Sequence, residues 1–240
     1  MQIKGKTTLI TGAAKRIGRD IALNLAKDGS DIVIHYNSSD TEANSLKREI
    51  EALGVKAYII KSDLTDQEQL KKFVKDVLET VHIDILINNA SIYYRTPLES
   101  ASFEDLDKFY NIHVKAPFYL SKIFGKKMYE RKEGRIINII DYSAILPYPD
   151  YTPYTISKGA MITMTKAFAK ELAPYVLVNG VLPGPIIPPE NLEDKEIPLK
   201  KTILKRWAGG IEVYKAVKYL IETDFTTGSF IPVEGGRLIF

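Results

Sequence analysis

The 240-residue chain contains no cysteine. Disulfide bonds, zinc-thiolate sites and thiol nucleophiles are therefore excluded, and we expect no metal site. Charge of one sign is not in excess either, because 33 Lys and Arg residues against 30 Asp and Glu residues leave a net charge of +3. This balance argues against a nucleic-acid partner or a membrane surface and leaves small anionic ligands as candidates.

Long apolar runs are also missing, since no stretch of the sequence is long enough for a signal peptide or a membrane span. We therefore expect a cytoplasmic protein. No internal repeat, low-complexity tract or linker divides the chain, and 45% of its residues are hydrophobic, which is enough for a large core. We expect a single domain over residues 1–240.

Seven short apolar runs alternate with helical patterns, which is typical of βαβ units around a parallel sheet. The runs span residues 7–12, 31–36, 56–63, 84–90, 135–141, 176–184 and 229–236. Between the third and fourth runs, an apolar stripe at helical spacing should face the sheet: Leu70, Phe73, Val74, Val77 and Leu78. The pattern predicts an α/β fold. Five prolines within residues 183–199 predict a mobile loop without regular structure over a site.

The first apolar run ends in TGAAKRIG (11–18) and leads into a helix. Gly12 and Gly18 permit a tight turn and a close backbone approach, and the helix N-terminus offers free amide groups to an anion. The segment outlines a dinucleotide site, although a glycine pair can also serve structure alone.

The end of the second run bears on which dinucleotide is bound. An NAD-selecting fold usually has Asp or Glu there, whereas this chain has Tyr36, Asn37 and Ser38, so no carboxylate would repel a 2′-phosphate. Lys15 and Arg16 in the adjacent turn could supply positive charge, which favours NADPH over NADH. The alternative is that both are solvated surface groups.

Tyr154 is followed four positions later by Lys158. Hydride transfer to C=O or C=N leaves negative charge on the acceptor atom, which must be protonated. A tyrosine with its usual pKa of about 10 is a poor proton donor, but an ammonium one helical turn away favours the phenolate and would lower that pKa. The alternative for an isolated pair is an ordinary helix surface.

These residues together resemble the short-chain dehydrogenase/reductase family over nearly the whole chain. The matching motifs are TGAAKRIG (11–18), Asp63 with Leu64, NNAS (88–91), YTISK (154–158) and PGP (183–185). The resemblance implies a Rossmann-like, doubly wound fold with seven parallel strands in the order 3-2-1-4-5-6-7. It also implies a homodimer or homotetramer built through residues 102–130 and 153–173. The cofactor would contact Gly12, Lys15, Arg16, Ile17, Gly18, Tyr36, Asn37, Ser38, Asp63, Leu64, Asn89, Ala90, Ser91, Pro183, Gly184 and Ile186.

Two catalytic positions depart from the family pattern. Thirteen residues before the tyrosine, where the family has a serine, the chain has Asp141, while Ser143 is only eleven residues away. An ionised carboxylate there would repel a developing alkoxide; it suits a substrate with N–H donors, or a protonated Asp141 that passes a proton onward. The family's catalytic asparagine aligns with His113, and Asn111 would face elsewhere. His113 could join a proton relay or be purely structural.

Further departures resemble the pteridine reductase branch of the family. Arg16 replaces a glycine of the first turn, Ser91 replaces the last glycine of NNAG, and Tyr93 follows. The resemblance implies that Arg16 and Ser91 contact cofactor phosphate and pterin, and that Tyr93 stacks on the pterin; alternatively, Tyr93 caps the core. Residues 185–205 would form the substrate loop, with Pro188 where many relatives have a threonine.

We therefore expect an NADPH-dependent reductase of a dihydropterin or related C=N substrate, with Asp141, Tyr154, Lys158 and His113 as catalytic candidates. The alternatives are a reductase of 3-oxoacyl thioesters or other carbonyls, and a sensor that binds NADPH without turnover.

Overall fold

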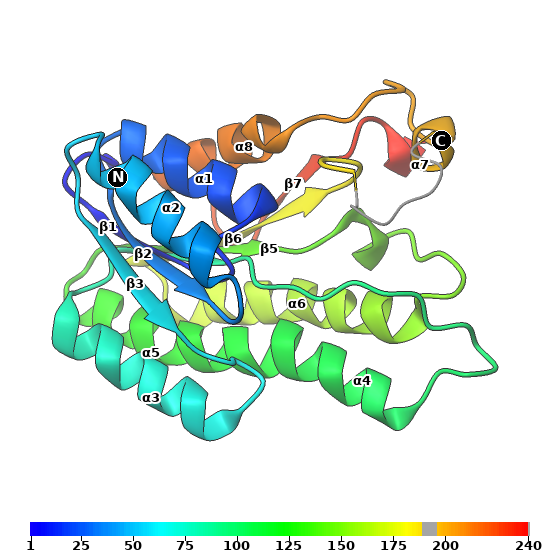
Figure 1. Cartoon of the computed structure of the whole chain (residues 1–240), viewed down its shortest axis with the longest axis horizontal. Coiled ribbons are helices and arrows are strands. Elements are labelled where there is room, and N and C mark those ends of the chain that lie inside the picture. Colours follow the sequence, from blue (N-terminus) through cyan, green and yellow to red (C-terminus); the bar gives the residue numbers. More distant parts are fainter. Residues whose placement is uncertain (189–195, 240) are drawn as a thin grey trace.

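The computed structural model describes residues 1–188 and 196–239. Its centre is one parallel sheet with the strand order β3-β2-β1-β4-β5-β6-β7, as predicted (Figure 1). The strands are β1 (Thr7–Ile10), β2 (Asp31–Tyr36), β3 (Ala57–Lys61), β4 (Ile85–Asn88), β5 (Gly134–Ile139), β6 (Val176–Pro183) and β7 (Phe230–Val233). The order reverses between β1 and β4, and in parallel α/β sheets ligands bind outside the carboxyl ends of the strands at such a point.

Helices cover both faces of the sheet (Figure 1). One face carries α1 (Arg16–Lys27), α2 (Asp40–Glu51) and α8 (Gly210–Glu222); the other carries α3 (Gln67–Thr80), α4 (Phe103–Tyr110), α5 (Ala116–Glu130) and α6 (Thr152–Glu171). A π-helical turn, Asn111–Lys115, joins α4 to α5. Two 3₁₀ turns, Tyr142–Ala144 and Arg237–Ile239, and the short α7 (Ile197–Lys200) complete the described elements. None of the described helices is long and apolar enough to cross a membrane.

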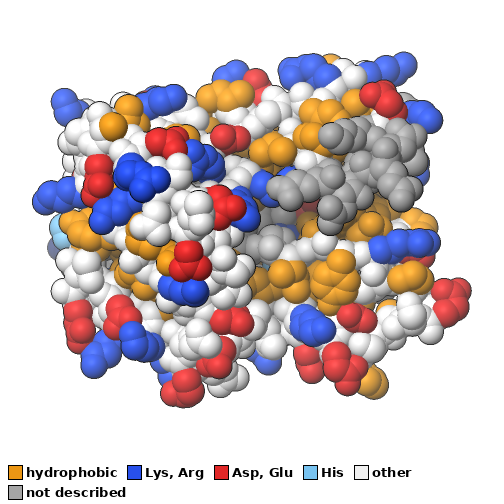
Figure 2. Space-filling view, in the orientation of Figure 1, with side chains coloured by type: hydrophobic (Ala, Val, Ile, Leu, Met, Phe, Trp, Pro, Cys, Tyr) orange, Lys and Arg blue, Asp and Glu red, His pale blue; other side chains and the backbone are white. Residues whose placement is uncertain are grey.

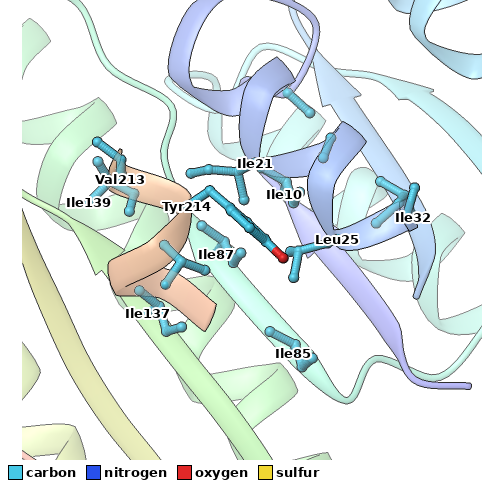
Figure 3. Packing of buried hydrophobic residues seen from close by; sticks show 14 of the residues in the cluster. Ile10, Ile21, Leu25, Ile32, Ile85, Ile87, Ile137, Ile139, Val213 and Tyr214 are labelled. Carbon is cyan, nitrogen blue, oxygen red and sulfur yellow. The ribbon is translucent and has the colours of Figure 1, made fainter. Parts of the chain in front are cut away.

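Alternation along the strands builds one core on each side of the sheet. Ile10, Ile32 and Ile34 are buried in the cluster that includes α1 and α8, whereas Leu9 and Val33, which alternate with them, are buried in the cluster of α3 and α5. Figure 3 shows the first cluster, in which isoleucines of the central strands lie beside the ring of Tyr214 from α8. The sheet is therefore packed against an apolar cluster on each face, and these two clusters fix the position of its carboxyl edge.

Three predictions about local structure need correction. The strands are shorter than most of the predicted runs, because residues such as Thr11 and Gly12 after β1 leave the sheet and form the ligand-facing turns. In α3 the side chain of Leu78 is 40% exposed, since it lies at the edge of the predicted stripe; the other four members are buried. Within residues 183–199, Pro183 ends β6 and α7 begins at Ile197, with Pro198 in its first turn, where proline is tolerated. The central part of the predicted loop, 189–195, lies outside the described residues.

Figure 2 shows charged side chains of both signs over most of one face of the molecule. Hydrophobic side chains are grouped in the right half of that view, toward which the carboxyl ends of the strands point in Figure 1. The residues of the predicted site come from the carboxyl ends of β1 to β6 and from the segments that follow these strands.

Candidate active site

The turn after β1 has the backbone geometry of a phosphate cradle. Gly12 has φ +63°, a left-handed value that favours glycine, and a Cβ on Gly18 would lie 2.4 Å from the Gly12 carbonyl oxygen. The Asn89 Nδ2 donates to the carbonyl oxygens of Thr11 (2.9 Å) and Gly12 (3.1 Å), which ties the turn to the segment after β4. The side chain of Lys15, the N-cap residue of α1, makes no capping hydrogen bond, and the amide groups of this first turn fit a dinucleotide pyrophosphate.

His35 on β2 forms a hydrogen bond with the same turn. Its Nδ1 lies 3.0 Å from the Gly12 amide nitrogen and must accept that proton, so Nε2 donates to the Ser62 carbonyl oxygen at 3.0 Å. The residue is buried, and burial lowers its pKa from 6.5 to about 4. His35 is therefore a neutral, structural partner of the glycine-rich turn, which the sequence pattern did not single out.

Arg16 occupies the turn position where the family has glycine, and it adopts the left-handed backbone, with φ +54°. Its guanidinium donates to the carbonyl oxygens of Ile187 (2.8 Å) and Pro188 (3.1 Å) beyond β6. Arg16 thus contacts the start of the predicted substrate loop, and its contacts with cofactor and substrate stay predictions. Pro188 contributes its carbonyl group there.

Lys15, one of the two basic residues expected to meet a 2′-phosphate, is already paired with a carboxylate. The Lys15 Nζ lies 2.8 Å from Glu42 Oε1 on α2, and Asp40 on the same helix binds the Tyr36 hydroxyl and the Lys61 ammonium, each at 3.1 Å. The end of β2 itself has no carboxylate, but Asp40 on α2 contacts the Tyr36 hydroxyl there. Asn37 and Ser38 are exposed in between.

The remaining predicted cofactor residues lie at the same edge. Leu64 is buried, and Asp63 Oδ1 accepts from the Thr65 amide (2.9 Å) and hydroxyl (2.7 Å). A Cβ on Gly184 would lie 2.7 Å from the Glu234 Cα, so the PGP turn has no room for a side chain at this position. The others are Ile17, Asn89, Ala90, Ser91, Pro183 and Ile186, of which Pro183 and Ile186 are buried.

Tyr154 and Asp141 form a buried pair. Pro153 lies in the first turn of α6, so Tyr154 stands at the start of that helix, and its hydroxyl interacts with the carboxylate of Asp141, just after β5. The Ser143 amide donates to Asp141 Oδ1 at 2.8 Å, which fixes the carboxylate. Of the two residues weighed as partners of the tyrosine, Asp141 is therefore the one in contact with its hydroxyl.

The electrostatics of this pair differ from the expectation. Burial, and then the charge of Asp141, raise the pKa of Tyr154 well above 10. The prediction that Lys158 lowers that pKa is wrong for this structure, because the ammonium lies over the phenol ring, 5.6 Å from its centroid, and donates to the Ile139 carbonyl oxygen at 3.3 Å. Burial also raises the pKa of Asp141 above 3.8 and lowers that of Lys158 to about 8.

His113 lies in the π-helical turn and is fully buried beside the catalytic candidates. Its ring meets that of Tyr154 edge to face, with centroids 5.5 Å apart, and its two nitrogens contact Ser91 and Ser157. Asn111 faces elsewhere, as expected: it lines a separate pocket of about 240 Å³ together with Leu64. Helical spacing alone did not predict the π-helical turn, a feature common at functional sites.

Three tyrosines form an aromatic wall at the mouth of the site. Tyr93, half exposed, stacks on Tyr151 with centroids 4.8 Å apart and an interplanar angle of 11°, and it meets Tyr154 edge to face at 5.1 Å. The Tyr148 hydroxyl lies 3.4 Å from that of Tyr93. Of the three, Tyr93 alone was predicted from the sequence; the repeated tyrosines of PYPDYTPY (147–154) were the available signal for the other two.

Comparisons with known proteins agree with this geometry. A model of the short chain dehydrogenase family matches residues 6–196. The 3-oxoacyl-[acyl-carrier-protein] reductase FabG of Thermotoga maritima is 35% identical, with all of both chains covered. Among solved structures, FolM alternative dihydrofolate reductase 1 from Brucella canis, complexed with NADP, is 31% identical with a TM-score of 0.91, covering 100% of this chain and 97% of that one. A blue fluorescent protein from a metagenomic library, in complex with NADPH, is 30% identical with a TM-score of 0.91 and 99% of both chains covered.

Proposed function

Because the chain belongs to the short chain dehydrogenase family, we propose that it is an NADPH-dependent reductase of a C=N bond in a dihydropterin or a related nitrogen heterocycle. One observation carries the substrate class: the hydroxyl of Tyr154 pairs with the carboxylate of Asp141. A carboxylate at this place disfavours a developing alkoxide but is complementary to ring N–H and amino donors.

The chain's own residues divide the work as follows. NADPH, when bound, supplies the hydride that reduces the carbon of the C=N bond. Tyr154 donates its hydroxyl proton to the nitrogen that gains the electron pair. A proton from solvent, taken up through Asp141, whose pKa is raised by burial, then restores the tyrosine. Lys158 would hold the nicotinamide ribose, and its ammonium would keep positive charge beside Tyr154 and Asp141.

The aromatic wall supports a flat substrate. Tyr93 presents half of its surface at the mouth of the site and is braced from behind by Tyr151. A planar heterocycle can stack on such a ring and gains stabilisation beyond the buried area alone. An extended acyl chain makes no comparable use of a flat aromatic face.

NADPH as the preferred cofactor rests on the end of β2, which has no carboxylate, and on Lys15 in the turn. The Lys15–Glu42 pair must open, or Glu42 must turn away, for Lys15 to meet a 2′-phosphate. The cradle of Gly12, Gly18 and the first turn of α1 fits the pyrophosphate of either dinucleotide.

The test is cofactor oxidation by the purified protein. With dihydrobiopterin, dihydromonapterin or dihydrofolate we expect turnover that uses NADPH in preference to NADH. Failure to turn over every pterin, together with good turnover of acetoacetyl thioesters, would contradict the proposal.

A second candidate is reduction of a 3-oxoacyl thioester, and the FabG of Thermotoga maritima, 35% identical over its full length, favours it. This candidate predicts that Asp141→Ser, which restores the family's usual residue, keeps or raises activity. The pterin proposal predicts the opposite result, so the one variant separates the two.

The protein is further proposed to form a homodimer or homotetramer. Tyr110, Phe118, Tyr129 and Ile156, on α4, α5 and α6, are each at least 39% exposed in the single chain, and apolar side chains of this size favour an interface. Light scattering of the purified protein should give a mass of two or four chains. A monomer at micromolar concentration would contradict this.

A further inference from the structure

The buried side chain of His113 is the centre of a series of hydrogen bonds. Its Nδ1 lies 2.8 Å from the Ser157 Oγ, and its Nε2 lies 2.8 Å from the Ser91 Oγ. The Ser157 Oγ in turn lies 2.6 Å from the Tyr154 carbonyl oxygen. These hydrogen bonds thus connect the catalytic helix α6, through the π-helical turn, to the segment after β4.

The proton positions along this series of hydrogen bonds follow from its fixed end. A carbonyl oxygen can only accept, so the single Ser157 hydroxyl proton must lie between Ser157 and Tyr154. Ser157 therefore has no proton left for His113, and Nδ1 must be the nitrogen that carries a hydrogen and donates. If Ser157 donated its proton to His113 instead, the lone pairs of the Ser157 Oγ and the Tyr154 carbonyl oxygen would face each other at 2.6 Å. If Nδ1 carried no hydrogen, its lone pair would face those of the Ser157 Oγ at 2.8 Å.

The second nitrogen of His113 is then an acceptor. Burial, and then the charge of Lys158, hold the pKa of His113 well below 6.5, so the ring is neutral and has only one N–H. Nε2 is therefore bare and accepts the hydroxyl proton of Ser91. The Ile92 carbonyl oxygen, 3.3 Å from the same hydroxyl, is the more distant acceptor; a proton turned toward it would leave Nε2 facing lone pairs at 2.8 Å.

We propose that Ser91 is a specificity-determining residue, locked by the positioning residue His113 as a pure hydrogen-bond acceptor toward the ligand. Ser91 is exposed at the carboxyl end of β4, on the edge of the sheet that carries the site. Its hydroxyl proton is committed to His113, so only lone pairs remain for a bound molecule. The site then offers two acceptors, Ser91 and Asp141, and selects flat rings that bear N–H or amino donors.

This inference rests on the proposed function for its substrate class, and it adds a reason for that class. A free serine hydroxyl can turn to donate or accept, and would bind carbonyl and N–H groups alike. A locked hydroxyl cannot. A ligand that offers only carbonyl oxygens therefore meets lone pairs at both Ser91 and Asp141, and an acceptor that a bound ligand covers without offering it a donor is costly.

The orientation is tested on the wild-type protein without any substrate. Isotope-labelled histidine and a two-bond nitrogen–proton correlation spectrum show which ring nitrogen carries the hydrogen. We expect the proton on Nδ1 for His113, identified by its loss in His113→Asn, and on Nε2 for His35, whose contacts require the opposite tautomer. His35 is thus an internal reference. A proton on Nε2 of His113 would overturn the proposal.

The selectivity is tested by ligand binding in the presence of NADP⁺, without turnover. The probes are pterin, which carries donors, and naphthoquinone, a flat ring pair with carbonyl acceptors only; the chain has no cysteine to react with the quinone. Calorimetry should show that Ser91→Ala reduces the preference for pterin over naphthoquinone roughly fivefold, as expected for loss of one neutral hydrogen bond. Ser157→Ala, which frees the tautomer of His113, should reduce it in the same direction.

Ser100→Ala, in the exposed segment before α4, is the matched control and should leave the preference unchanged. An unchanged preference in Ser91→Ala would overturn the inference. If the preference shifts as expected but no dihydropterin is turned over, the proposed function fails while the role of Ser91 stands.

Discussion

Glu42 on α2 holds the Nζ of Lys15 at 2.8 Å, across the turn that is expected to receive a dinucleotide. Their side chains are 42% and 49% exposed, so the pair is one that an incoming anion can open at little cost. The carboxylate competes with a 2′-phosphate for the same ammonium. The preference for NADPH should therefore be weaker than the absence of a carboxylate at the end of β2 suggests.

Glu42→Gln should lower the KM for NADPH by roughly two- to fivefold, the range expected from an exposed ion pair, and leave the KM for NADH unchanged. Steady-state kinetics with both cofactors provide the measurement. Glu49→Gln is the matched control, because Glu49 lies on the same helix, is 43% exposed and pairs with Arg19 at 2.6 Å. An equal change with NADH would show that Lys15 does not meet the 2′-phosphate.

Asp141→Ser should reduce kcat/KM for a dihydropterin about 100-fold, because the variant removes both the acceptor for the substrate's donors and the proton partner of Tyr154. Activity toward an acetoacetyl thioester should be kept or rise. Cofactor oxidation with both substrates, at saturating NADPH, checks the result. Retention of pterin reduction at the wild-type rate would show that the carboxylate is not used.

The pH dependence of the reaction should follow Lys158, whose pKa is lowered by burial from 10.5 to about 8. The ammonium is present below pH 8 and is lost as the pH rises through that value, so kcat/KM should fall above about pH 8. A pH–rate profile from pH 6 to about pH 10 tests this. In Lys158→Arg the guanidinium stays protonated over the whole range, so any activity that this variant keeps should not fall above about pH 8. A flat wild-type profile would contradict the assignment.

His35 should make the fold sensitive to moderate acid. Its pKa is about 4 in the folded protein and 6.5 in the unfolded chain, so its contribution to stability is complete above pH 6.5 and is lost as the pH falls toward 4. The total loss amounts to about 3 kcal/mol. Urea unfolding at several pH values between these limits should show a shallower dependence in His35→Asn, whose amide can accept from Gly12 but does not titrate. Parallel curves for the two proteins would contradict the prediction.

Much of this protein could be predicted from local sequence. The alternation of short apolar runs with helical stripes determines a parallel sheet, since buried strands need apolar residues on both faces. The glycines of TGAAKRIG are required because Gly12 takes a left-handed backbone and Gly18 has no room for a Cβ. Counting thirteen residues back from Tyr154 pointed to Asp141, and the contact between their side chains is present.

Other features were decided only when distant segments packed together. Glu42 meets Lys15 because α2 folds back on the first turn, and Arg16 reaches Ile187 across more than half of the chain. The pKa of Tyr154 rises because burial and Asp141 outweigh an ammonium that lies over its ring, which spacing along one helix could not reveal. His113, in a π-helical turn, gains its two serine partners from the segment after β4 and from α6. Sequence therefore determined which residue types reach the site, since motif spacing follows from strand and helix periodicity. Tertiary structure decided their protonation and orientation, since both depend on burial and on partners far away in the chain.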